Sequence, residues 1–177
     1  MNATNKELTR VQRDSDNKYN LINAQGKLFF DKWFEWIEYF DEGLARVQIE
    51  SNGKFNLITE NGKFLLEQWF EWIGDFDDGL ALVQKGRENP RFNYIDKEGK
   101  IISSEWFRFV GYFKDGIAIV QREDYLHNLI DIQGKILSEE WFEWVDDFDK
   151  YDRAVVYRTN GERCKIDKEG KIVGFSK

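Results

Sequence analysis

The sequence has few of the residues that proteins use for cross-links and for catalysis. Among 177 residues there is one cysteine, Cys164, one proline and one histidine, His127. A single cysteine excludes an internal disulfide and a multi-cysteine metal site. No run approaches 18 apolar residues, and the N-terminal MNATNKELTR has no apolar stretch of the kind found in signal peptides. We therefore expect a cytoplasmic protein that does not enter a membrane.

Motifs for catalysis or cofactor binding are also missing. His127 stands where other copies of the repeat described below have tyrosine or phenylalanine, and Cys164 stands at an asparagine position. No nucleophile motif or glycine-rich phosphate loop is present. The segment GDFDDG at 74–79 lacks the loop length and final glutamate of an EF-hand. We predict that the protein is not an enzyme and has no catalytic residues, cofactor or metal.

Charge narrows the class of partner. The formal net charge is −7, and 16% of the residues are aromatic, which is unusual for a disordered chain. A negative surface repels phosphate backbones, so direct binding of nucleic acid is disfavoured. A folded, soluble protein with a basic protein partner is the expectation.

An internal repeat of about 36 residues is the strongest signal in the sequence. Trp-Phe recurs at 33–34, 69–70, 106–107 and 141–142, and Gly-Lys recurs at 26–27, 62–63, 99–100, 134–135 and 170–171. The repeat predicts one domain over 8–177, after a frayed leader at 1–7. Its units are 8–43, 44–79, 80–116 and 117–152, with a partial unit at 153–177.

Each unit is expected to form β-structure. LARVQ at 44–48, KYNLI at 18–22 and GKLFF at 26–30 are typical of short strands. Turns such as NAQG at 23–26 end in a glycine, which indicates a positive φ. WFEWIEYF at 33–40 fits a helical face or an extended segment followed by a turn, and we favour the extended form. The predicted fold is all-β, a tandem array of about five β-meander repeats, open and solenoid-like, with propeller-like closure as the alternative.

This pattern resembles the bacterial WG-repeat family, also called KWG repeats, as a divergent member. KYNLINAQGK at 18–27 carries the front half of the family unit, and FEWIEYFDEGLARV at 34–47 carries the back half. The Trp-Gly pair is replaced, for example by Tyr19-Asn20 and Phe55-Asn56, and the family's proline is missing. The resemblance implies an all-β repeat array and an interaction role, in bacteria or their phages, and it implies no catalytic residues.

Two sets of side chains could form a functional surface. The seven tryptophans are expected mainly to stack as a buried Trp-Phe ladder between units, with one tryptophan of a pair possible on the outer surface. The carboxylates that accompany them are either solvated turns or a docking surface for a basic partner. Such a docking surface could also mimic nucleic acid and block the basic channel of a nucleic-acid-binding enzyme, as an anti-CRISPR-like inhibitor would. The candidate partner-binding residues are Glu35, Glu38, Asp41, Glu42, Glu71, Asp75, Asp77, Asp78, Glu143, Asp146, Asp147 and Asp149.

Overall fold

The computed structural model describes residues 8–51 and 53–175, and in these residues it contains strands and turns but no helix. The all-β repeat array predicted from the sequence is confirmed. The leader predicted at 1–7 lies outside the described residues. The chain divides into two compact units, one reaching Arg87 and including Lys97–Lys100, the other formed by Glu88–Asp96 and the chain from Ile101 onward.

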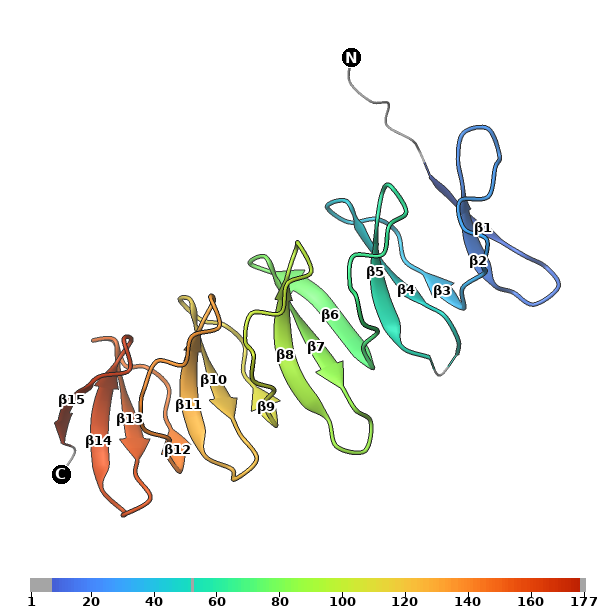
Figure 1. Cartoon of the computed structure of the whole chain (residues 1–177). Coiled ribbons are helices and arrows are strands. Elements are labelled where there is room, and N and C mark those ends of the chain that lie inside the picture. Colours follow the sequence, from blue (N-terminus) through green and yellow to red (C-terminus); the bar gives the residue numbers. More distant parts are fainter. Residues whose placement is uncertain (1–7, 52, 176–177) are drawn as a thin grey trace. The chain divides into compact units, whose positions relative to one another are not determined.

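The first unit contains three antiparallel pairings or sheets (Figure 1). They are the hairpin β1-β2, the sheet β3-β4-β5 and the pair β6-β7. The strands are β1 (Thr9–Gln12), β2 (Tyr19–Ile22), β3 (Trp36–Ile37), β4 (Leu44–Gln48), β5 (Phe55–Thr59), β6 (Trp72–Asp77) and β7 (Leu80–Lys85).

The second unit repeats this plan. Its sheets are β9-β10-β11 and β12-β13-β14-β15, both antiparallel. The strands are β8 (Arg91–Asp96), β9 (Phe109–Val110), β10 (Ile117–Gln121), β11 (His127–Asp131), β12 (Trp144–Val145), β13 (Arg153–Tyr157), β14 (Arg163–Asp167) and β15 (Ile172–Phe175).

Each sheet begins with the segment that was ambiguous in the sequence. In β3-β4-β5, Trp36 pairs with Gln48 and Ile37 with Val47, so this part of WFEWIEYF is an edge strand. The extended interpretation is therefore correct. A two-residue turn follows, in which Asp41 and Leu44 exchange backbone hydrogen bonds of 2.9 Å. A sheet thus takes its edge strand from one sequence unit and its next two strands from the following unit.

The expectation of a strand in GKLFF is wrong for the first four copies. There the segment makes only one bridge to the preceding strand, Leu28 to Ile22 in the first copy. A buried asparagine explains the departure. The Nδ2 of Asn128 donates to the carbonyls of Ser138 and Glu140, both at 2.9 Å, while its Oδ1 accepts from the amides of Leu129 at 2.7 Å and Ser138 at 3.2 Å.

The same arrangement recurs at the other asparagines of the repeat. Asn20 and Asn56 make the corresponding four bonds, and Asn93 donates to the carbonyls of Ser103 and Glu105. In the last copy Cys164 takes this position, and there the segment does form a strand, β15, in which Phe175 pairs with Cys164. The asparagine side chain supplies partners for backbone groups that leave the sheet.

The buried ring of each Trp-Phe pair is the phenylalanine. Phe34, Phe70, Phe107 and Phe142 are at most 1% exposed, whereas the tryptophans before them are only partly buried. The expected Trp-Phe ladder is therefore chiefly a phenylalanine core. Contacts do run between copies in the first unit, where the ring of Phe64 lies 6.0 Å from that of Phe30 and 6.2 Å from that of Phe34, centroid to centroid.

Glycines of the NAQG-type turns have the positive φ predicted for them, and those after the first copy, Gly62, Gly99, Gly134 and Gly170, also pack against the previous copy. At Gly134, φ is 83°, and an added Cβ would lie 1.8 Å from the carbonyl oxygen of Ile102. At Gly116, φ is 79°, and the same atom would meet nothing within 4 Å. Only hydrogen at Gly134 permits the backbones of adjacent copies to approach this closely.

Comparing Gly134→Ala with Gly116→Ala therefore isolates the contact between copies. Both changes should cost the left-handed strain of about 1–2 kcal/mol. Gly134→Ala should cost about 1–3 kcal/mol more, because the methyl group overpacks the contact. Urea unfolding measures the difference, and equal losses would contradict close stacking at Gly134.

A second pair of substitutions tests which ring forms the core. Phe142→Ala should lower the free energy of unfolding by about 3–5 kcal/mol, the usual loss for a large buried aromatic. Trp144→Ala, at a side chain that is 55% exposed, should cost about 1 kcal/mol or less. Thermal unfolding compares them, and a Trp144→Ala loss as large as that of Phe142→Ala would show that the core is assigned wrongly.

Candidate functional site

One aromatic residue stands exposed on the edge strand of each sheet. Trp36 on β3 and Trp72 on β6 are 41% and 43% exposed in the first unit, and Phe109 on β9 and Trp144 on β12 are 51% and 55% exposed in the second. The next residue along each strand is buried, because successive side chains point to opposite faces. We call these four residues the edge aromatics.

The edge aromatics are supported from the side by a second ring. Tyr19 lies edge-on to Trp36 with centroids 5.6 Å apart, and His127 lies in the same way against Trp144 at 5.3 Å. Nδ1 of His127 is 3.0 Å from the carbonyl of Glu143, which can only accept a hydrogen bond, so Nδ1 donates. Nε2 then accepts from the amide of Gln121 at 3.0 Å. Both ring nitrogens have structural partners, in keeping with an aromatic replacement.

Cys164 is completely buried. It lies in an apolar cluster of the second unit with Val156 and Ile166. In the described part of the chain, no group of three or more histidine, cysteine or acidic side chains could hold a metal ion.

Some of the predicted carboxylates belong to turns. Glu42 and Gly43 have φ of 45° and 84°, and Asp78 has 47°, so these acids occupy the left-handed positions of tight hairpins. The carboxylate of Asp149 accepts hydrogen bonds from the amides of Tyr151, at 2.8 Å, and Arg153, at 3.2 Å. The bond from Tyr151 is the main reason why the pKa of Asp149 lies below its ordinary value.

Other predicted carboxylates are paired with cations of the chain itself. Arg46 contacts Glu38 at 2.6 Å and Asp75 at 3.1 Å, and Glu42 pairs with Lys97. Glu71 pairs with Lys54 at 3.5 Å and Arg87 at 2.6 Å, and its pKa is lowered chiefly by the hydrogen bond from Arg87. Asp146 accepts a bond of 2.9 Å from the indole of Trp144.

Seven of the twelve candidates form no ion pair within the described residues. They are Glu35, Asp41, Asp77, Asp78, Glu143, Asp146 and Asp147. The carboxylates that looked alike in the sequence thus differ in their availability to a partner.

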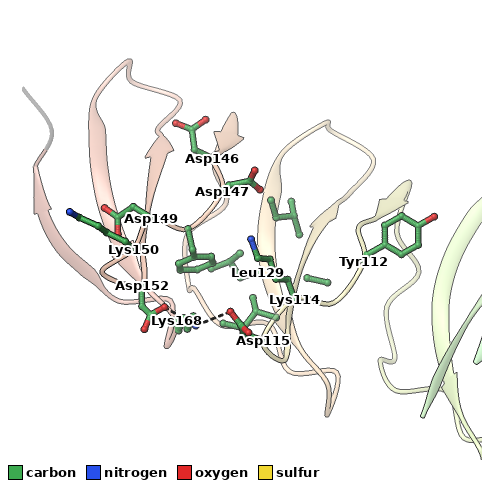
Figure 2. A pocket seen from close by; sticks show the side chains of 14 residues that line it. Tyr112, Lys114, Asp115, Leu129, Asp146, Asp147, Asp149, Lys150, Asp152 and Lys168 are labelled. Atoms are coloured by element: carbon green, nitrogen blue, oxygen red, sulfur yellow. Dashed lines mark hydrogen bonds and ion pairs between the residues drawn. The ribbon is translucent and has the colours of Figure 1, made fainter. Parts of the chain in front are cut away.

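The second unit contains a groove between the sheets β9-β10-β11 and β12-β13-β14-β15 (Figure 2). Its volume is about 320 Å³, and apolar side chains from both sheets line it, among them Ile119, Leu129 and Phe148. Figure 2 shows Asp146 and Asp147 toward one end and, toward the other, Lys168 held between Asp115 and Asp152. These ion pairs measure 3.4 and 2.8 Å. The hydrogen bond to Asp152 is the main cause of the raised pKa of Lys168.

The first unit has the corresponding groove between β3-β4-β5 and β6-β7, with a volume of only about 110 Å³. Leu57 and Phe76 occupy the positions of Leu129 and Phe148 in the repeat, and Lys97 occupies that of Lys168. The main difference is Arg46, which stands where the second groove has Ile119. Sequence reasoning did not identify either groove.

The structure contains no helix, in the parts it describes, that is long and apolar enough to cross a bilayer. Comparison with protein families gives a match to the WG-containing repeat, over residues 21–55, 57–87 and 94–125, together more than half of the chain. No curated protein matches the sequence.

Several solved structures are similar at low sequence identity. BamB from Moraxella catarrhalis is 10% identical with a TM-score of 0.37, and 96% of this chain and 60% of that chain are covered. Virginiamycin B lyase from Staphylococcus aureus is 14% identical with a TM-score of 0.33. The match covers 99% of this chain and 68% of the lyase chain. The computationally designed Ika8 protein is 13% identical with a TM-score of 0.36. That match covers 98% of this chain and 59% of the Ika8 chain.

Proposed function

The chain belongs to the WG-containing repeat family, and from that premise we propose that it is a non-enzymatic protein–protein interaction module. It presents aromatic and acidic side chains to a basic protein surface. The observation that supports this proposal best is the recurrence of a half-exposed aromatic at the same edge-strand position in four successive copies, Trp36, Trp72, Phe109 and Trp144.

The energetics of exposed rings favour binding over a role in folding. A ring that remains about half exposed contributes only part of its possible burial energy to the fold. Tryptophan and tyrosine are the residues most enriched at the energetic centres of interfaces. Tyr39 and Tyr112, which follow Trp36 and Phe109 by three residues, are 78% and 89% exposed and add to the aromatic surface.

Charge supports a basic partner. The net charge is −7, and the unpaired carboxylates include Asp77, Asp78 and Asp147, which are all exposed. Carboxylates of this kind steer a basic partner toward the surface and act mainly on the association rate.

The test replaces all four edge aromatics with serine and compares the variant with wild type by affinity purification from the native host. Partners found by mass spectrometry are then measured by surface plasmon resonance. The variant should bind at least about tenfold more weakly, as the loss of interface hot spots requires. The control replaces Tyr151 and Phe175 with serine. These aromatic side chains are 68% and 75% exposed but lie away from the edge-aromatic positions, so binding should not change.

Surface plasmon resonance also distinguishes an ordinary interaction module from an inhibitor that mimics nucleic acid. Reversal of Asp77, Asp78 and Asp147 to lysine should slow association, and added salt should weaken it, because exposed charges are screened beyond about 8 Å at physiological ionic strength. Competition by RNA or DNA for the same partner would favour the inhibitor. Retention of every partner by the four-serine variant would refute the interaction surface.

A further inference from the structure

The position occupied by Arg46 differs between copies in a way that changes the grooves. The equivalent residues are Arg10, Arg46, Leu82, Ile119 and Val155. In the first two copies the side chain is an arginine that reaches across to the next copy. In the second unit this position is Ile119, whose side chain does not cross the groove as the arginine does.

The two arginines make the same kind of contact. Nη1 of Arg46 donates to the carbonyl of Ile73, and the guanidinium also pairs with Asp75 at 3.1 Å. Nη1 of Arg10 donates to the carbonyl of Ile37 at 2.8 Å, and its guanidinium lies over the ring of Tyr39 at 4.5 Å. In both cases the carbonyl that accepts the hydrogen bond belongs to the residue directly after an edge aromatic. The second contact of the guanidinium is with the side chain two residues after that carbonyl.

The second groove retains the counterparts of these contacts. Val145 corresponds to Ile73, and Asp147 corresponds to Asp75. Asp146 stands where the first groove has Gly74 and adds another carboxylate. Lys168 is already held between Asp152 and Asp115, and Asp149 pairs with Lys165 at 3.9 Å. The remaining charged groups of the lining are Lys114 and Lys150, against Asp146 and Asp147.

We propose that the groove lined by Ile119, Phe148 and Asp147 binds an arginine side chain of the protein partner, in the place that the chain's own Arg46 takes in the first unit. The apolar lining accommodates the methylene stem, and the carboxylates receive the planar guanidinium, whose forked donors suit them better than a lysine ammonium does. The volume of about 320 Å³, against about 110 Å³ where Arg46 is present, provides the room. This inference rests on the proposed interaction with a basic partner and names the group that the partner inserts.

The direct test titrates the whole chain with N-acetyl-arginine amide and follows the backbone amides by ¹H–¹⁵N NMR. The neutral isostere N-acetyl-citrulline amide, at equal ionic strength, is the matched control ligand. Arginine should shift the amides of Ile119 and of Val145–Asp147 in a saturable manner, and citrulline should not. Shifts that are absent there, or equal for the two ligands, would overturn the proposal.

Two variants test whether the occupant of this position controls the groove. Ile119→Arg should fill the groove with a guanidinium of the chain and abolish the shifts at Val145–Asp147. Arg46→Ile should open the first groove and produce new shifts at Ile73–Asp75. Thermal unfolding of both variants verifies that they are folded. Arginine-induced shifts that persist in folded Ile119→Arg would mean that arginine binds exposed carboxylates and not the groove.

Binding of the partner separates this inference from the proposed function. Ile119→Arg should weaken binding of the partner by about tenfold, because the partner then loses one buried anchor. If Ile119→Arg leaves the affinity unchanged while the four-serine variant loses it, the groove inference fails and the interaction function stands. If neither variant changes the affinity, both fail.

Discussion

The buried asparagine of each copy is the interaction on which the rest of the structure depends. Asn20, Asn56 and Asn128 are at most 1% exposed, and each bonds to backbone groups one, ten and twelve residues further along the chain. A buried amide or carbonyl without a partner is costly, so a chain that leaves a sheet must find acceptors and donors elsewhere. The asparagine provides them and lets the chain cross to become the edge strand of the next sheet.

The position of the aromatics follows from this path. The crossing delivers Phe34 or Phe142 into the core and leaves Trp36 or Trp144, two residues later, on the edge strand and partly in solvent. The side chains that we propose for binding are therefore fixed by the same backbone bonds that define each copy. The grooves between sheets arise in the same way, and their contents depend on one further position, that of Arg46 and Ile119.

The sequence predicted the parts of this structure that depend on local pattern. Its periodicity identified the copies, and the composition of LARVQ and the final glycine of NAQG indicated a strand and a positive-φ turn. It did not predict that GKLFF leaves the sheet, because that depends on a side chain ten residues away in Asn20. Charge alone also could not distinguish Asp75, which pairs with Arg46, from Asp147, which forms no ion pair in the described chain. Aligning the copies shows arginine at position 46 and isoleucine at the equivalent position 119. The effect of this difference on the groove can be recognised only when it is known that this side chain faces the next sheet.

The most direct measurement of the central claim is hydrogen exchange of the Leu129 and Ser138 amides in Asn128→Leu. Leucine has nearly the same shape as asparagine but cannot form the hydrogen bonds. The account predicts a loss of at least about 2 kcal/mol of stability, because buried backbone groups lose their partners. It also predicts that the Leu129 and Ser138 amides lose more protection than the amide of Val120 on the neighbouring strand. Unchanged stability together with unchanged protection at these two amides would contradict it.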